Sequence, residues 1–213
     1  MPIPSFYFSD LVYKKLRDFQ EVRSAVVNLN HEGAAFISTK VHLGDTNPQA
    51  LINTLSWVKS ITCFFDTTIP IAVTSKMTIN ERKYPKALVQ GSVQNYLKYS
   101  NITGYSKGEE EVLHTPLSSC DFSTMNNVAG MQGCVTEFAL ERNWIQFDTH
   151  LNLALALISE LGEVASLLVW IKEDVALASD VPTSLRAKIV HELADVVIYL
   201  LRLAQLPDVN VKL

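Results

Sequence analysis

Cysteine is scarce in this chain of 213 residues, which contains only Cys63, Cys120 and Cys134. The three lie far apart and match neither a disulfide framework nor the paired spacing of a zinc site. We therefore expect reduced thiols that pack as small apolar side chains. The N-terminus also lacks the basic region, apolar core and small-residue cleavage site of a secretory signal, so a cytoplasmic location is the expectation.

Glycine-rich loops and excess positive charge are lacking as well. Eight glycines are scattered without the spacing of a Walker or Rossmann phosphate loop. The formal net charge is −4 and no basic cluster is long enough to follow a phosphate backbone, so no nucleic-acid polymer is expected as a partner. The longest apolar run, 151–171, is interrupted at its centre by Glu160 and Glu163. It therefore predicts a buried bundle helix and no membrane partner.

The remaining composition is that of a folded chain, 48% hydrophobic and 19% charged. Apolar spacing and helix-ending prolines predict helices over 11–27, 49–65, 72–83, 151–171 and 184–204. No stretch alternates for long enough to require a sheet, so the expected fold class is an all-α helical bundle. A short connector joins the last two helices, which should form an antiparallel hairpin.

Weak internal similarities raise the question of a duplication. Residues 8–9 and 122–123 are both Phe-Ser and each precedes a predicted helix, while 55–58 lines up with 193–196 through a shared leucine and valine. These residues alone leave a tandem, diverged duplication and a chance similarity both open. A Ser-, Thr-, Gly- and Asn-rich stretch in mid-chain predicts a linker. The corresponding division is a first copy at 1–110, a linker at 111–130 and a second copy at 131–213.

Two pairs of acidic residues carry the clearest chemistry. Glu160 and Glu163 stand on one predicted helix and Glu192 and Asp195 on the next, each pair at positions i and i+3 and so on one helical face. In an antiparallel hairpin the two pairs can converge, and their mutual repulsion then calls for a cation. Four hard oxygen ligands favour Mg²⁺, with Mn²⁺ as an alternative.

The competing interpretation is a solvated acidic helix face. It fits poorly around Glu160 and Glu163, because their neighbours are apolar and not Lys, Arg or Gln. A carboxylate-bridged di-iron site requires Glu-x-x-His motifs from paired helices, and the chain's only such motif, Glu111 with His114, lies in the predicted linker. No Ser, His and Asp arrangement indicates nucleophilic catalysis.

The motifs of the second half resemble a known family, the MazG-like all-α NTP pyrophosphatases, and most closely the dCTP pyrophosphatases. The matching residues are Phe138-Ala139-Leu140-Glu141-Arg142-Asn143-Trp144, Asn152, Glu160-x-x-Glu163, Trp170, Glu192-x-x-Asp195 and Tyr199. The resemblance covers about 122–211, including the separations between motifs. It implies Mg²⁺-dependent hydrolysis of the α–β bond of a deoxynucleoside triphosphate, with Trp144 and Trp170 stacking on the base.

This chain departs from the family pattern at two places. Val135 stands where the family has a base-contacting His, which opens the question of base preference. The family's substrate-binding tail, expected after the second acidic helix, is instead similar to residues 69–85 upstream. This placement favours the duplication, with two copies packed as a pseudo-dimer. Thr54 and Trp57 occupy the first-copy positions that correspond to Glu192 and Asp195, so the first copy is expected to be a non-catalytic partner that lends its tail.

The expected site combines both copies. Its metal ligands and catalytic residues are Glu160, Glu163, Glu192 and Asp195, and its substrate-binding residues are Trp144, Asn152, Trp170, Tyr199, Lys76, Asn80, Lys83 and Tyr84. The expected substrate is dCTP or a modified dCTP, in nucleotide-pool house-cleaning, and two chains are expected to form a homo-oligomer that imitates the family tetramer. Two alternatives stay open at this point: the same chemistry on dUTP or another nucleotide, and a catalytically degenerate oligomerisation or regulatory module.

Overall fold

The computed structural model describes residues 5–43, 47–86, 89–91, 122–172, 175 and 177–207. These residues contain α-helices α1 (Phe19–Ser38), α2 (Pro48–Phe64), α3 (Ile69–Lys83), α5 (Val128–Glu141), α6 (His150–Ser166) and α7 (Thr183–Gln205). A π-helical turn at Thr39–Leu43 extends α1, and 3₁₀ turns lie at Phe8–Asp10, Phe122–Thr124, Ile145–Phe147 and Ala178–Asp180. Within the described residues there is no strand, only an isolated bridge between Tyr7 and Asn127. The predicted all-α fold is confirmed.

Polar side chains at the helix starts explain where most of these helices begin. The first five helices each begin after a residue whose side chain accepts a hydrogen bond from a backbone N–H of the first turn, and these caps are Asp18, Asn47, Thr68, Asn127 and Thr149. Each cap satisfies a donor that has no partner within its helix. Prolines in the first turns of α2 and α3 need no backbone donor there, so both helices tolerate them.

The predicted helix over 11–27 is wrong at its start, because the Asp18 cap sets the first helical residue at Phe19. The segment before it is extended and lies along α2. The Lys59 ammonium donates to the carbonyls of Ser9 and Leu11, both at 2.7 Å, and the Lys14 backbone N–H donates to the Ser60 hydroxyl at 3.1 Å. Leu11 and Leu16 of this segment are therefore buried without a helical face, whereas Val12 and Tyr13 are exposed.

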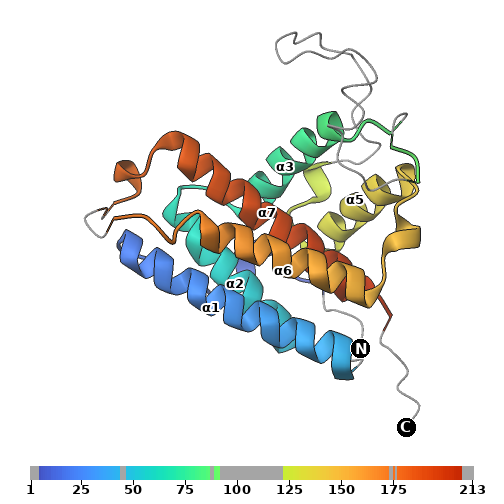
Figure 1. Ribbon diagram of the computed structural model, residues 1–213, viewed down its shortest axis with the longest axis horizontal. Helices are drawn as coiled ribbons and strands as arrows, with labels where there is room; N and C mark the ends of the chain where they lie inside the picture. The colour runs from blue at the N-terminus through green and yellow to red at the C-terminus, as the bar shows by residue number, and fades with distance from the viewer. Residues whose placement is uncertain are drawn as a thin grey trace.

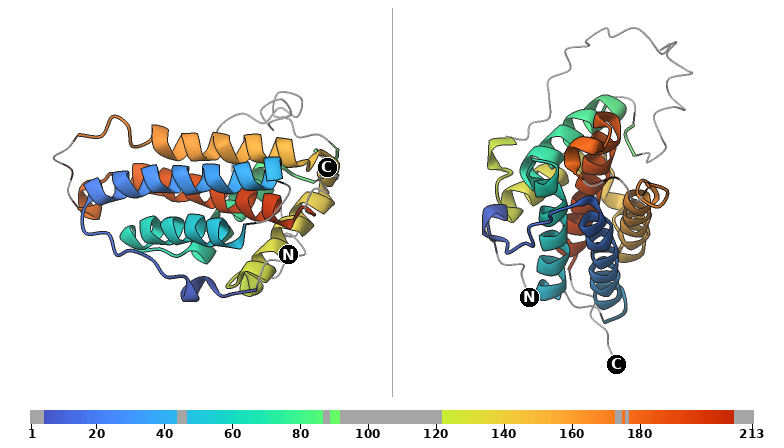
Figure 2. Two further views of the ribbon diagram at one scale, coloured as in Figure 1. Left: turned by 90° about the horizontal axis from the view of Figure 1, so that it is seen from below. Right: turned by 90° about the vertical axis from the view of Figure 1, so that its left-hand side faces the viewer.

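Two helical hairpins form the bundle. Helix α1 packs on α2 and α6 packs on α7, while α1 also contacts α6 and α2 contacts α7. These four helices run along the long axis of the molecule, with α3 and α5 packed against α7 (Figures 1 and 2). Leu29, Leu55, Leu157 and Leu193, one from each bundle helix, are fully buried. Helix α7 therefore lies at the centre of the molecule, where both hairpins and α3 meet.

Two hairpins side by side are what the predicted pseudo-dimer requires, and the duplication itself stays a prediction. The predicted linker, 111–130, lies outside the described residues up to 121. Its remaining part contains the 3₁₀ turn at Phe122–Thr124 and the start of α5. None of the helices in the described residues is both long and apolar enough to span a membrane.

Cysteine pairing differs from the sequence-based expectation. Cys134 is disulfide-bonded, so the prediction of reduced thiols is wrong for this residue, whereas Cys63 has a free thiol. Disulfide formation depends on the approach of two Cβ atoms in the fold, and spacing along the chain does not reveal that approach.

Candidate active site

Packing of α6 against α7 brings acidic side chains of both helices together. One carboxylate oxygen from each of Glu160, Glu163 and Glu192 lies within 4.8 Å of the other two. Helix α1 closes on this end of α6, since a Cβ at Gly33 would lie only 2.7 Å from Cδ1 of Leu161. The glycine thus permits a close approach of the first hairpin beside the acidic cluster.

The fourth acid, Asp195, is paired with a lysine from the first half of the chain. Lys76 on α3 lies 2.5 Å from Oδ2 of Asp195 and 3.9 Å from Oε2 of Glu192, measured from its Nζ atom. All three side chains are largely buried, with exposed fractions of 14%, 13% and 21% for Lys76, Asp195 and Glu192. Because α3 packs across α7, a cation from residues 69–83 stands directly over the carboxylates of the second hairpin.

Burial and mutual repulsion make this cluster hard to ionise without a counter-charge. Burial raises the pKa of Glu160 to about 8, with further increases from Asp195, Glu163 and Glu192 and a smaller opposing effect of Lys76. Burial likewise raises the pKa of Asp195 to about 6, although Lys76 lowers it. Lys76 itself has a raised pKa, because attraction to Asp195, Glu192 and Glu160 outweighs its desolvation. One lysine therefore offsets only part of the negative charge.

These pKa shifts predict how the stability of the metal-free protein depends on pH. A carboxyl group whose pKa is higher in the folded than in the unfolded state stabilises the fold below its unfolded pKa and loses that contribution as pH rises. For Glu160 the window runs from 4.5 to about 8. In EDTA, the free energy of unfolding is expected to fall across this window. Urea unfolding at a series of pH values measures the slope, and Glu160→Gln should flatten it; an equal slope in that variant would contradict the assignment.

A cavity of about 540 Å³ opens beside the acidic cluster, between α3, α5, α6 and α7. At one end are Glu160, Asp195 and the basic or amide side chains of α3. At the other end are apolar and aromatic residues of α5 and of the turn before α6. The lining residues are Lys76, Met77, Asn80, Lys83, Tyr84, Val135, Phe138, Ala139, Trp144, Phe147, Asp148, Asn152, Leu153, Leu155, Ala156, Glu160, Asp195, Ile198, Tyr199 and Arg202.

The aromatic wall of the cavity is built across both halves of the chain. The Trp144 ring contacts Tyr84 at 5.1 Å and Phe138 at 5.8 Å between centroids, both edge to face. Arg142 fixes this arrangement, because its Nε donates to the Tyr84 carbonyl at 2.7 Å and its guanidinium stacks 3.5 Å from the Phe138 ring centroid. The end of α3 is thereby held against α5.

Most of the residues predicted from the sequence meet in this cavity. Lys76, Asn80, Lys83, Tyr84, Trp144, Asn152, Glu160, Asp195 and Tyr199 line it. Glu163 and Glu192 do not line it but belong to the acidic cluster beside it, where Glu163 is exposed. Trp170 is not brought to the cavity, because α6 ends at Ser166 and this indole, 90% exposed, lies in the turn beyond it.

Three charged residues at the site were missed as site residues. Arg142 stood only within a motif, and nothing in the sequence singled out Arg202. Asp148 carried no motif at all. Its place in the cavity depends on the turn that connects α5 to α6, which sequence periodicity does not describe.

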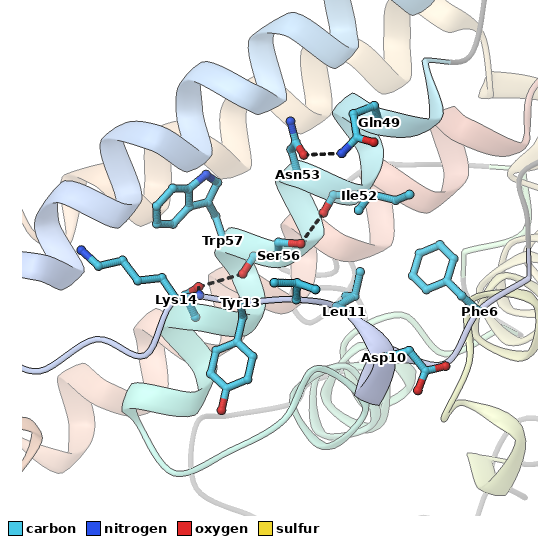
Figure 3. A pocket seen from close by; sticks show the side chains of 12 residues that line it. Phe6, Asp10, Leu11, Tyr13, Lys14, Gln49, Ile52, Asn53, Ser56 and Trp57 are labelled. Atoms are coloured by element: carbon cyan, nitrogen blue, oxygen red, sulfur yellow. Dashed lines mark hydrogen bonds between the residues drawn. The ribbon is translucent and has the colours of Figure 1, made fainter.

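A second cavity, of about 810 Å³, lies away from the carboxylates, between α2 and the extended N-terminal segment (Figure 3). Its lining residues are Phe6, Asp10, Leu11, Val12, Tyr13, Lys14, Gln49, Ile52, Asn53, Ser56, Trp57 and Ser60. Trp57 lines it, and Thr54 is buried with its hydroxyl donating to the Ala50 carbonyl at 2.7 Å. Neither position offers a carboxylate, and Asp10 is the only acid among the described residues that line this cavity.

Comparison with curated proteins finds relatives of one kind. The chain is 35% identical over 103 residues to bovine dCTP pyrophosphatase 1, an alignment that covers 48% of this chain and 59% of that protein. Human dCTP pyrophosphatase 1 gives the same identity and coverage, and the mouse protein is 46% identical over 68 residues, which is 32% of this chain and 40% of its own. The chain thus spans less than two thirds of these relatives. These similarities support a relationship with dCTP pyrophosphatases.

No family model and no solved structure matches the chain.

Proposed function

We propose that this protein is a nucleoside-triphosphate pyrophosphohydrolase that converts dCTP or a modified dCTP to the monophosphate and pyrophosphate, in nucleotide-pool house-cleaning. The observation that carries the proposal is a single cavity with acids and lysines at one end and aromatic side chains at the other. A nucleotide has the complementary layout, with phosphates at one end and a flat base at the other. The names of the curated relatives support the same substrate.

The donor set fits a hard divalent cation. Three glutamate oxygens within 4.8 Å of one another, with Asp195 beside them, are the oxygen-only ligands that Mg²⁺ prefers and Mn²⁺ accepts. We propose that Glu160, Glu163, Glu192 and Asp195 hold this ion as the cofactor. When bound, it would neutralise phosphate charge and polarise an attacking water.

The protein's own side chains would orient the substrate. Lys76 and Lys83 would donate to phosphate oxygens, with Asn80 between them on α3. Burial raises the pKa of Tyr199, so its hydroxyl stays protonated and can donate a hydrogen bond at neutral pH. Trp144 would form the wall against which the base packs, as its contacts with Tyr84 and Phe138 hold it in place.

The reaction needs no protein nucleophile. Water oxygen bonds to the α-phosphorus while the bond from that phosphorus to the α–β bridging oxygen breaks, and pyrophosphate leaves with the bridging oxygen. Charge neutralisation and alignment are the main contributions that a protein makes to such a displacement. Lys76 would neutralise part of the phosphate charge, and the acids would contribute by holding the divalent ion.

We also propose that one active site is made from two diverged copies, with the first copy inactive. The lysines of the cavity come from residues 69–83, and the carboxylates of the acidic cluster come from α6 and α7. The contact between Lys76 and Asp195 supports this shared construction.

A pyrophosphate-release assay tests the proposal. The intact chain should release pyrophosphate from dCTP in the presence of Mg²⁺ and none in EDTA, measured beside dUTP, dTTP, dATP and dGTP. A preference for dUTP would support the proposed pyrophosphohydrolase reaction but would show that dUTP, and not dCTP, is the substrate. No release from any nucleotide, with Mg²⁺ or Mn²⁺ present, would leave a regulatory or oligomerisation module as the function.

The exposed apolar face of α6, which reaches the cavity at Leu155, supports self-association of two chains. Leu151, Leu155 and Ile158 are each more than half exposed and stand one turn apart, and α6 carries no Lys or Arg. A charge-free apolar face of this kind is self-complementary in a two-fold dimer. We propose that a second copy of the chain covers it, and that neither membrane nor nucleic-acid polymer is a partner.

Ile158→Lys is expected to convert such a dimer to a monomer at micromolar concentration, because it places a charge in the centre of the apolar face. Sedimentation velocity measures the change in mass. Leu140→Lys is the matched control, since Leu140 is equally exposed but lies on α5. A wild-type protein that sediments as a monomer would refute the proposed assembly.

A further inference from the structure

The aromatic end of the cavity contains one buried ion pair. Asp148 follows the 3₁₀ turn before α6, and Arg202 lies near the end of α7. Their charged groups are in contact, and the exposed fractions of the two side chains are 12% and 9%. Both line the cavity, beside Val135 and Phe138. A largely apolar and aromatic end of the cavity thus holds a carboxylate and a guanidinium side by side.

The pair is held in place from one side. Nη1 of Arg202 donates to the Thr136 hydroxyl at 3.0 Å, and this hydroxyl donates to Oε1 of Gln205 at 2.9 Å. Asp148 contacts Arg202 through Oδ2. In the part of the chain that the structure describes, Oδ1 of Asp148 accepts no hydrogen bond. The carboxylate therefore keeps a free acceptor at a position that lines the cavity.

The position of the pair suits a base and not a phosphate. Arg202 stands seven residues after Asp195 on α7, which is about two turns or roughly 10 Å along the helix. The lysine–carboxylate end and the ion pair are therefore at opposite ends of the cavity, with the Trp144 wall on the ion-pair side. A substrate whose phosphates lie by Lys76 would place its base next to Asp148 and Arg202.

We propose that Asp148 and Arg202 select the nucleobase by hydrogen bonds to its edge, and that the base selected is cytosine. The proposal deepens the proposed function and rests on it. A carboxylate only accepts and a guanidinium only donates. The carboxylate of Asp148 offers an acceptor, and the guanidinium of Arg202 beside it offers two donors. Together they complement a base edge that presents an amino donor followed by two acceptors, as the edge of cytosine does. Uracil and thymine present a carbonyl where the amino group stands, and this carbonyl would face the carboxylate.

The pair also accounts for the departure at position 135. Val135 cannot hydrogen-bond to a base through its side chain, whereas the resembled family has a histidine there. The polar groups at this end of the cavity now come from Asp148 and Arg202, on different elements. Thr136 does not line the cavity, and it acts as a positioning residue that orients the Arg202 guanidinium.

Binding of dCMP and dUMP, measured by calorimetry on the intact chain, tests base selection without requiring hydrolysis. Wild-type protein should prefer dCMP. Asp148→Asn keeps the shape of the side chain but adds an amide donor, and it should reduce the dCMP to dUMP preference by about ten- to a hundredfold. Thr136→Val should reduce the same ratio less. Asp10→Asn, which changes an acid of the second cavity, should leave the ratio unchanged.

The outcomes separate this inference from the proposed function. Equal weakening of both nucleotides by Asp148→Asn would show an ion pair that only supports the fold and would overturn the inference. If Asp148→Asn does not fold, an unaltered ratio in Thr136→Val would overturn it. Pyrophosphate release by wild-type protein together with no selection between the two bases would refute the inference alone. Selective dCMP binding without release from any triphosphate would refute the proposed function alone.

Discussion

Replacing Glu160 and Glu192 together by alanine is expected to abolish metal binding and to lower pyrophosphate release at least about a thousandfold. The two residues come from different helices, and their oxygens lie within 4.8 Å of each other and of Glu163. Without them only Glu163 and Asp195 remain, and Asp195 is already paired with Lys76. A metal ion supplies several kcal/mol of charge stabilisation, and each ~1.4 kcal/mol is a factor of ten in rate.

Thermal unfolding with and without Mg²⁺ measures the binding directly. At a concentration one hundred times its dissociation constant, a ligand stabilises the fold by about 2.7 kcal/mol. Wild-type protein should show such a shift and the double variant none. Asp10→Ala combined with Glu32→Ala removes as many acids away from the cluster, and this control should keep the full shift. A Mg²⁺-dependent increase in thermal stability that persists in the Glu160, Glu192 double variant would refute the proposed metal site.

Lys76→Ala is expected to lower kcat/KM for the best substrate by roughly ten- to a hundredfold, because one charge-assisted phosphate contact is worth ~1.5 to 3 kcal/mol. The lysine is largely buried and reaches Asp195 and Glu192 from a helix of the other half of the chain. Lys76→Arg should recover part of the loss, since it restores the charge with a different geometry. Asn80→Ala should produce a smaller loss in the same direction.

Steady-state kinetics on purified variants give the comparison. Lys188→Ala serves as the matched control, because Lys188 is an exposed lysine on α7 itself. It should change kcat/KM by less than about twofold, as expected for a screened surface charge. Full activity in both Lys76→Ala and Asn80→Ala would show that α3 is only a scaffold for the carboxylates.

The sequence predicted helix ends well where capping residues and prolines lie close to them. The bounds expected for α2 and α7 differ from the observed ones by one residue at each end, because their starts depend on nearby caps and prolines. For α1 the apolar pattern predicted a start at residue 11, but the helix begins at Phe19 because Asp18 caps it. For α6 the apolar run continued past the last helical residue, Ser166, and Trp170 lies in the turn beyond that end.

By itself the sequence determined the all-α class, the hairpin of the last two helices and the two acidic pairs, since spacings of three and four residues depend only on the pitch of a helix. Only the tertiary structure decided that Lys76 meets Asp195, that Trp144 packs on Tyr84, and that Asp148 and Arg202 pair in the same cavity. These contacts join segments far apart in the chain. They depend on how α3 and α5 pack against α7, and this packing results from the burial of many side chains together and not from any local pattern.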